Sequence, residues 1–208
     1  MAQFFSIHSE NPQLRLIHRA VAIIRSGGVI AYPTDSSYAL GCQLESRSAL
    51  NRICAIRQLS DKHNFTLTCK DLAQVAGFGK MDNDAFRLIK ALTPGPFTFI
   101  LKATKAVPKQ LQHAKRKTIG VRLPDHRVAE GLLNEFNEPL FSSTLILPGD
   151  QASITDPQEI RECLEKKVDL VIDSGVIDYA PTTIIAFPEG CPEIIRQGKG
   201  VTPMLGTS

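Results

Sequence analysis

Residues 27–42 read GGVIAYPTDSSYALGC. The run from Val29 to Tyr32 is apolar and of β type, and Pro33 stops it because proline has no N–H to donate to a sheet. Upstream, Asn11-Pro12 is typical of the start of a helix, and Gly27-Gly28 is typical of its end. A helix, a strand and then a hydroxyl-rich loop predict an α/β fold with polar groups gathered after the strand.

Helix-type and strand-type segments alternate irregularly along the rest of the chain. Further helices are predicted to begin at Ser46, at Asp82 and at Asp156-Pro157, and one to span residues 127–136. Strands are predicted over residues 65–69, 97–101, 118–122, 139–144, 168–172, 182–187 and 193–196. Because some strands follow one another directly, we expect a twisted, mixed and largely open sheet flanked by helices rather than a strict βαβ repeat.

Length and composition are those of an ordinary globular chain. The 208 residues fit one domain, expected over residues 1–208, with 43% hydrophobic and 22% charged residues. No run approaches the roughly 20 apolar residues of a membrane span. The N-terminus lacks the basic and apolar regions of a secretory signal. These features predict a soluble, cytoplasmic protein with no membrane partner.

The metal-binding and nucleophile motifs of the commonest enzyme classes are missing from the sequence. The five cysteines are scattered without a C-x-x-C pair, which favours reduced, mostly buried thiols over a zinc site. The five histidines have no metal-ligand spacing. No Walker A loop, G-x-G-x-x-G, H-E-x-x-H or G-x-S-x-G motif is present. We therefore expect no metal site.

Charge is distributed unevenly along the chain. The formal net charge is only +3, yet residues 85–124 hold nine lysines and arginines and none of the 21 acids. Such asymmetry steers an anionic partner to one side of a protein. A solvated lysine-rich face kept for solubility is the alternative. The length of the acid-free span favours binding of an anionic partner.

Hydroxyl side chains occur at the ends of apolar strands. They lie in residues 34–38, in Ser142-Ser143-Thr144 and in Thr182-Thr183. Strand ends with hydroxyls, arginines and helix N-termini nearby form pockets for phosphates and small polar ligands. Hydroxyls at strand ends are also ordinary turn chemistry. Spacing alone leaves both interpretations open.

Residues 27–42 closely resemble the signature of the YrdC-like family, the threonylcarbamoyl-adenylate synthases and their relatives. Further matches follow in order along nearly the whole chain, at residues 94–98, 119–126, 139–144, 180–185 and 195–198. Residues 62–67, KHNFTL, are similar to the YciO-type branch.

The resemblance implies a twisted α/β sheet with a basic concave surface that binds nucleotide and double-stranded RNA. In the synthases, carboxylated L-threonine attacks the α-phosphate of ATP, pyrophosphate leaves and threonylcarbamoyl-AMP forms, which a partner complex uses to modify tRNA. The implied substrate is ATP with Mg²⁺, without a tightly bound cofactor. The implied partners are ATP or AMP, double-stranded RNA or tRNA, and ribosomal or tRNA-modification proteins.

Two sets of candidate residues follow, the first mainly from family positions and the second from the acid-free run of cations, and no catalytic residue is assigned. The small-molecule set is Thr34, Tyr38, Arg57, Lys62, Arg122, Ser142, Thr144, Thr182 and Arg196. The RNA set, in the lysine-rich loop between two predicted strands, is Lys102, Lys105, Lys109, Lys115, Arg116 and Lys117.

Two family motifs are altered. The K-x-R motif, whose cations hold the ATP phosphates, reads Arg57-Gln58-Leu59, so one cation is a leucine. The S-x-N motif reads Thr144-Leu145-Ile146, so the asparagine amide is lost. Losing a charged hydrogen bond costs about 1.5–3 kcal/mol, and two losses together weaken ATP binding or catalysis by roughly 10²–10⁴. Lys62 is the candidate to replace the missing charge.

Three functions remain open from the sequence. The first is a nucleotide- and double-stranded-RNA-binding protein with weak or lost threonylcarbamoyl-AMP synthase activity. The second is an active synthase acting in tRNA modification, and the third is a ribosome or RNA maturation factor.

Overall fold

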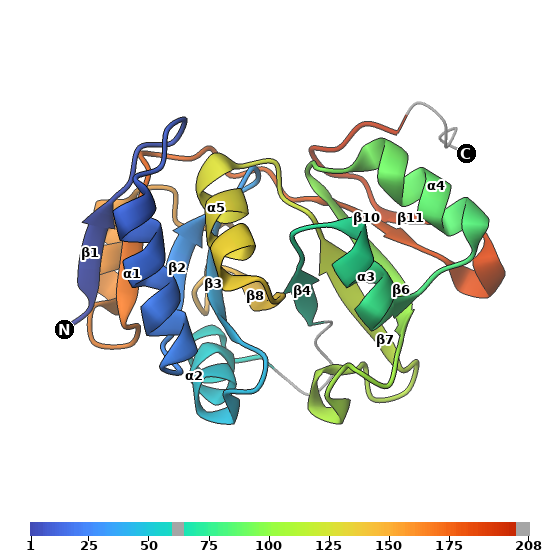
Figure 1. Ribbon diagram of the computed structural model, residues 1–208, viewed down its shortest axis with the longest axis horizontal. Coiled ribbons are helices and arrows are strands. Elements are labelled where there is room, and N and C mark those ends of the chain that lie inside the picture. Colours follow the sequence, from blue (N-terminus) through green and yellow to red (C-terminus); the bar gives the residue numbers. More distant parts are fainter. Residues whose placement is uncertain (60–64, 203–208) are drawn as a thin grey trace.

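The structure is a computed structural model that describes residues 1–59 and 65–202. The described residues form an 11-stranded mixed sheet in the order β1-β9-β2-β3-β8-β4-β7-β6-β10-β11, and β5 pairs with β6 outside this path (Figure 1). The strands are β1 Gln3–Ser6, β2 Ile30–Pro33, β3 Tyr38–Gln43, β4 Thr66–Thr68, β5 Gly79–Lys80, β6 Phe97–Ala103, β7 Thr118–Arg122, β8 Leu140–Thr144, β9 Leu170–Asp173, β10 Thr183–Ala186 and β11 Glu193–Arg196. Parallel and antiparallel pairs alternate irregularly, which confirms the predicted mixed sheet.

Helices flank this sheet. They are α1 Leu14–Arg25, α2 Arg47–Arg57, α3 Leu72–Phe78, α4 Asn83–Leu92, α5 Arg127–Phe136 and α6 Pro157–Leu164, with short 3-10 turns at Lys109–Leu111 and Pro188–Gly190. In Figure 1, α1 and α5 lie side by side over one half of the sheet, and α3 and α4 lie over the other. None of the helices in the described ranges has the length and apolar character that crossing a membrane requires.

Three of the predicted helix starts are confirmed by their caps. The side chains of Ser46, Asp82 and Asp156 accept hydrogen bonds from backbone N–H groups in the first turns of α2, α4 and α6. The predicted start at Asn11 is wrong, since α1 begins at Leu14 with Gln13 before it. The reason is local: Nδ1 of His8 accepts hydrogen bonds from the backbone N–H groups of Glu10 and Asn11, so a turn occupies these residues.

Sequence patterns missed β1, β3, β5 and α3. Strand β3 was expected to be part of a hydroxyl-rich loop, but it pairs with β2 on one side and β8 on the other. Its residue Gly41 is small because a Cβ there would lie 2.8 Å from the ring of Tyr32, and Ala39 is buried in the same core cluster as Tyr32. A strand that alternates large apolar with small residues does not show the apolar–polar period on which strand prediction depends.

Two clusters of buried side chains form the core. The smaller packs α1 and α5 against one face of β2 and β9, through residues such as Ile17, Leu132 and Tyr32. The larger lies under α2 and α6 and continues along the sheet to α3 and α4. Consecutive residues of β2 belong to different clusters, with Ile30 in the smaller and Ala31 in the larger, as expected for a strand buried on both faces.

The middle of the sheet has two unlike faces. Residues directly opposite in paired strands share a face. One row across β3, β8, β4, β7 and β6 is Cys42, Phe141, Leu67, Val121 and Phe99, all fully buried. The neighbouring row, on the other face, is Gly41, Ser142, Thr66 and Gly120. Mid-sheet strands therefore place an apolar row into the core and a row of glycines and hydroxyls on the opposite face.

Candidate functional site

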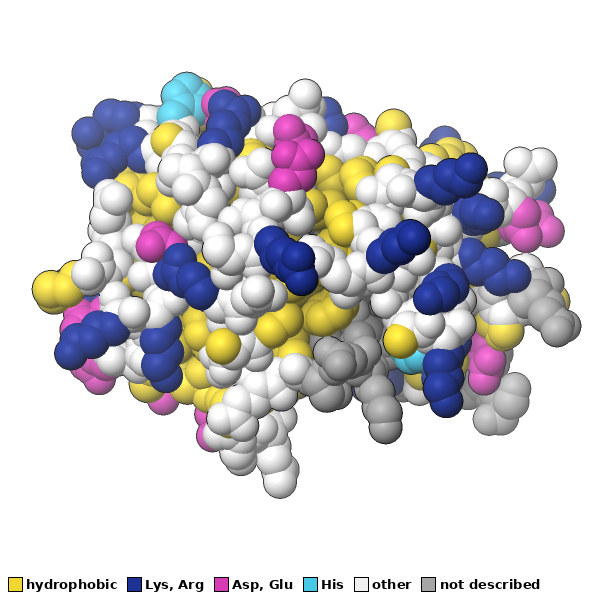
Figure 2. All heavy atoms as spheres, turned by 90° about the horizontal axis from the view of Figure 1, so that it is seen from below, with side chains coloured by type: hydrophobic (Ala, Val, Ile, Leu, Met, Phe, Trp, Pro, Cys, Tyr) yellow, Lys and Arg dark blue, Asp and Glu magenta, His cyan; other side chains and the backbone are white. Residues whose placement is uncertain are grey.

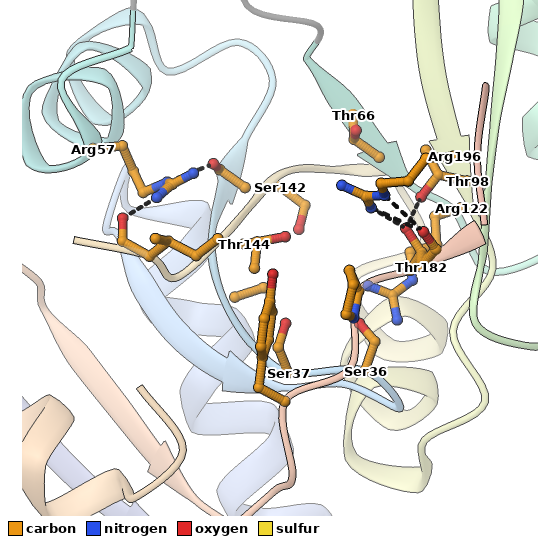
Figure 3. A pocket seen from close by; sticks show the side chains of 15 residues that line it. Ser36, Ser37, Arg57, Thr66, Thr98, Arg122, Ser142, Thr144, Thr182 and Arg196 are labelled. Atoms are coloured by element: carbon orange, nitrogen blue, oxygen red, sulfur yellow. Dashed lines mark hydrogen bonds between the residues drawn. The ribbon is translucent and has the colours of Figure 1, made fainter. Parts of the chain in front are cut away.

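Ser142 and Thr66, the hydroxyl residues of this second row, line a cavity of about 170 Å³, here called the arginine pocket (Figure 3). Strand, loop and helix-end residues that are far apart in the sequence line it. They are Ser36, Ser37, Ala39, Arg57, Thr66, Thr98, Arg122, Ser142, Ser143, Thr144, Ile146, Tyr179, Pro181, Thr182 and Arg196. Figure 3 shows Arg57 on one wall, Arg122 and Arg196 on the opposite wall, and Ser36 and Ser37 between them at the base.

Arg57 is held at the C-terminal end of α2. Its Nη1 donates to the backbone carbonyl of Ile146, and its Nε donates to Oγ of Ser143 at 3.2 Å. Burial lowers the pKa of this guanidinium, while the nearby Tyr179 opposes that shift. No carboxylate in the described part of the chain forms an ion pair with it. Arg57 is therefore a fixed, uncompensated cation on the pocket wall.

Arg122, at the end of β7, is paired behind the pocket. Its Nη2 donates to Oδ1 of Asp35, and both side chains are buried. Oδ2 of Asp35 and Nε of Arg122 are buried without a hydrogen-bond partner. An unmatched donor and acceptor at a buried pair are costly unless water or a ligand group satisfies them.

Arg196 of β11 is fixed by backbone contacts. Its Nε and Nη2 donate to the carbonyl oxygen of Thr182 at 3.2 and 2.9 Å. The hydroxyl of Thr182 lies 2.8 Å from that of Thr98 on β6. Like Arg57, this guanidinium forms no ion pair among the described residues. It leaves a second free positive charge facing Arg57 across the pocket.

The loop between β2 and β3 is locked by Thr34. Its hydroxyl donates to the carbonyl of Ser37 at 2.6 Å and accepts from the N–H groups of Ser36 and Ser37. The loop is also tied to the C-terminal part of the chain. The N–H of Ala180 donates to the carbonyl of Ser36, and Nζ of Lys199 donates to the carbonyl of Asp35 at 2.6 Å.

The pocket wall carries positive charge and hydroxyl groups without carboxylates. Among the described residues that line it, none is Asp or Glu. No group of three or more His, Cys, Asp or Glu side chains in residues 1–59 and 65–202 is placed to hold a metal ion. Guanidinium groups and hydroxyls arranged in this way bind phosphate or carboxylate oxygens.

Six of the predicted small-molecule residues line the arginine pocket: Arg57, Arg122, Ser142, Thr144, Thr182 and Arg196. Thr34 and Tyr38 lie behind the lining instead. The hydroxyl of Tyr38 donates to the carbonyl of Gly175 at 2.7 Å and accepts from the N–H of Ser174, which anchors the segment leading to Tyr179. Burial raises the pKa of Tyr38 to about 12. Lys62 lies outside the described residues.

Several lining residues were not predicted, although some left a signal. Thr66 and Thr98 each precede a buried apolar residue in a strand, so their position on the opposite face follows from the period of two. Pro181 lies within the family match at residues 180–185, whereas Tyr179 left no signal, because long-range packing brings it to the site. Ser143 also lines the pocket and belongs to the hydroxyl run Ser142-Ser143-Thr144, although it is not among the predicted site residues.

The two altered family positions differ in where they lie. Ile146 lines the arginine pocket, and its carbonyl oxygen accepts the hydrogen bond from Arg57. Leu59 is not part of the lining and packs, partly buried, against the larger core cluster. Leu59, at the position where the family motif is expected to carry a cation, therefore packs against the core beside the site.

The predicted RNA residues lie at the far end of β6 and in the loop that follows. All six are exposed: Lys102, Lys105, Lys109, Lys115, Arg116 and Lys117. Figure 2 shows several lysine and arginine side chains over its right-hand part, the side on which β6 and β7 lie in Figure 1, and others over its left-hand part. The structure thus presents two separate groups of cations, one around the pocket and one on the surface.

Comparison with known proteins connects this site to a family. Residues 22–198 match the model of the Sua5/YciO/YrdC domain, described as telomere recombination. The chain is 53% identical to YciO of Escherichia coli K12 over 99% of its length and 100% of the relative. The crystal structure of E. coli YciO superposes with a TM-score of 0.93, covering 97% of this chain and 98% of that one.

More distant relatives have assigned activities or bound molecules. The chain is 32% identical to the threonylcarbamoyl-AMP synthase of Coxiella burnetii RSA 493, over 81% of this chain and 90% of the relative. A crystal structure of P. abyssi Sua5 complexed with L-threonine superposes with a TM-score of 0.85 at 25% identity, covering 94% of this chain and 57% of that one. The protein belongs to the Sua5/YciO/YrdC family.

Proposed function

We propose that the arginine pocket binds a nucleotide through its phosphates, and that the protein is a nucleotide- and double-stranded-RNA-binding member of its family with weak or lost threonylcarbamoyl-AMP synthase activity. One observation carries the proposal. Three arginines meet at a small cavity whose described lining has no carboxylate, and Arg57 and Arg196 have no ion-pair partner there. Two uncompensated guanidiniums favour a ligand that carries at least two negative charges.

The relatives indicate which anion this is. A Coxiella relative is a threonylcarbamoyl-AMP synthase, and P. abyssi Sua5 was solved with L-threonine. In such a synthase a carbamate oxygen of carboxylated threonine bonds to the α-phosphorus of ATP, and the bond to the bridging oxygen breaks as pyrophosphate leaves. Catalysis here depends on positioning and on cations that neutralise the phosphate charge. Any Mg²⁺ arrives with ATP, because the described lining offers it no carboxylate.

Weak activity follows from what the pocket lacks. Ile146 presents an apolar side chain where the synthase pattern has an amide, and Leu59 contributes to the core instead of placing a second cation at the end of α2. The remaining arginines still bind phosphate oxygens. Binding of the nucleotide is therefore weakened less than the rate of threonylcarbamoyl-AMP synthesis.

Calorimetric titration with ATP, AMP and L-threonine tests the nucleotide proposal. Arg57→Gln and Arg196→Gln should each raise the Kd for ATP about 10- to 100-fold, because each removes charged hydrogen bonds of about 1.5–3 kcal/mol. Arg47→Gln, which removes an exposed arginine from the other end of α2, is the matched control and should leave the Kd unchanged. Absence of ATP binding by the wild-type protein would overturn the proposal.

Pyrophosphate release separates the binding protein from an active synthase. The weak-activity proposal expects release from ATP that depends on L-threonine and bicarbonate and is slower than that of the Coxiella relative by roughly 10²–10⁴. A rate equal to that of the relative would favour the active synthase. No change in that rate after Arg57→Gln would argue that the pocket is not the site of the reaction.

Double-stranded RNA binding is favoured by a separate observation, the six exposed cations at the end of β6 and in the loop that follows it. Electrophoretic shift assays over a range of salt concentrations test it. With about five phosphate contacts, log K should fall against log salt with a slope of roughly −3 to −5. A flat response, or no shift, would reject this part of the proposal.

A further inference from the structure

A second cavity, of about 460 Å³, lies at the ends of β5 and β6 and beside the loop that leads into β7. Four lysines line it: Lys80, Lys105, Lys109 and Lys117. The other lining residues are Ala103, Thr104, Val107 and Gln112. We call this cavity the lysine hollow. None of its described lining residues is acidic, and Lys80 was not among the cations that the sequence assigned to RNA.

The hollow is built by an ordered loop. The hydroxyl of Thr104 donates to the carbonyl of Gly77 at 2.7 Å, which ties the loop to α3. The side-chain amide of Gln112 donates to the carbonyl of Val107 at 2.9 Å. Val107 and Leu111 are buried and anchor the loop in the core. The lysines therefore project from a fixed frame, which lowers the entropy lost when they bind a partner.

Positive charge in this region is uncompensated. None of the four lysines forms an ion pair with a described residue. Lys80 also lies directly opposite Lys102 in the β5–β6 pair, and like charges at opposed positions destabilise a sheet. Protection of an exposed sheet edge accounts for a lysine on β5, but not for the three lysines of the loop around the same cavity. A bound anion would relieve this repulsion.

The lining chemistry favours contacts with a phosphate backbone rather than with bases or apolar surfaces. None of the described residues that line the hollow is aromatic, so they offer bases nothing to stack on, and a duplex backbone fits better than single strands. The large hydrophobic side chains that are exposed, such as Leu14, Phe86 and Val176, lie elsewhere, so the hollow lacks the apolar anchors of membrane and protein contacts.

We propose that the lysine hollow seats phosphates of a duplex RNA backbone, at a site separate from the arginine pocket; this rests on the RNA binding proposed above. The two cavities lie at opposite ends of the same strands. Thr98 and Arg122 line the pocket, whereas Ala103 of β6 and Lys117, just before β7, line the hollow. Five residues along a strand span roughly 17 Å. RNA and a nucleotide can therefore be bound together.

The test compares two triple variants that remove the same charge. One is Lys80→Gln with Lys105→Gln and Lys109→Gln. The control is Lys90→Gln with Lys166→Gln and Lys167→Gln, which are exposed lysines outside the hollow. Binding of a duplex RNA of about 20 base pairs, longer than the roughly 16 that a double-stranded-RNA domain spans, is measured across salt concentrations. The same titration is repeated with saturating ATP and with a duplex DNA of equal length.

The hollow variant should raise the Kd for RNA at least tenfold and reduce the salt slope by about two to three, since each lysine on a phosphate contributes nearly one unit. The control should change the Kd less than about threefold, and ATP should leave RNA binding unchanged. Equal weakening by both variants, or displacement of RNA by ATP, would overturn the inference. Equal affinity for DNA would overturn the assignment to RNA.

Failure of this inference is distinguishable from failure of the proposed function. If the wild-type protein binds RNA and the hollow variant binds it equally well, the RNA proposal stands and this site is wrong. If the wild-type protein binds no RNA, both are wrong, whereas the ATP titration of the arginine pocket is decided independently.

Discussion

Arg122 donates a hydrogen bond from Nη2 to Oδ1 of Asp35, and the two side chains are only 8% and 9% exposed. The pair joins the loop after β2 to the end of β7, and Arg122 at the same time lines the arginine pocket. Pairing makes burial of the arginine tolerable, because a lone buried charge is far more costly than a paired one. Asp35 thus holds one wall of the pocket from behind.

Asp35→Ala should reduce the free energy of unfolding by about 3–5 kcal/mol, because it leaves Arg122 buried without its partner. The double variant Asp35→Ala/Arg122→Gln, which removes both charges, should be less destabilised than the sum of the two single variants. Urea unfolding of all four proteins measures this coupling. Strictly additive losses would mean that the two side chains do not stabilise each other.

Ile146→Asn should raise the synthase activity, whereas Leu59→Arg should lower the stability of the protein. Ile146 lines the pocket, so an amide there should raise threonine-dependent pyrophosphate release about tenfold, the value of roughly one hydrogen bond. Leu59 packs against the core, so an arginine there should lower the free energy of unfolding by about 1–3 kcal/mol. Ile146→Val is the control and should change neither. A rise in activity with Leu59→Arg alone would contradict this assignment.

Thr34→Val should destabilise the protein more than Thr34→Ser. Valine keeps the shape but removes the hydroxyl that donates to the carbonyl of Ser37 and accepts from two N–H groups. Leaving these buried groups unsatisfied costs about 1–3 kcal/mol. Thermal or urea unfolding gives the comparison, and equal stability of the two variants would show that the loop does not need the hydroxyl.

His126 should make the protein less stable in mild acid. Burial lowers its pKa below 6.5, although Asp35 and other acids nearby oppose the shift. The unfolded chain therefore binds a proton more readily, and stability should fall as the pH drops through 6.5. The Nδ1 of His126 also caps α5 by accepting from the N–H of Val128.

His126→Asn is the matched variant for that test, because asparagine retains the helix cap but does not titrate. Between pH 8 and pH 5, the unfolding free energy of the wild type should fall by more than that of the variant. A difference that stays constant over this range would rule out His126 as the source of the acid sensitivity.

Local features of the fold were readable from the sequence. Ser46, Asp82 and Asp156 were recognised as helix caps because a cap is a contact between residues two or three positions apart. Strand β7 lies at the predicted residues, and β6 extends the predicted strand by two, since both are apolar runs with clear ends. Strand β3 was missed because it alternates large apolar residues with the small Ala39 and Gly41 and so shows no apolar–polar period.

The sequence by itself determined the family signature at residues 27–42, the mixed α/β sheet and the acid-free run of lysines and arginines. Only the tertiary structure decided which of these charges act together. Asp35 and Arg122 are 87 residues apart, and Lys80 lies opposite Lys102 only because β5 pairs with β6. The physical reason is that helix caps and the hydrophobic period of a strand depend on residues close together in the sequence. A pocket depends on the order of the strands in the sheet, and burial of residues far apart in the sequence selects that order for the whole chain at once.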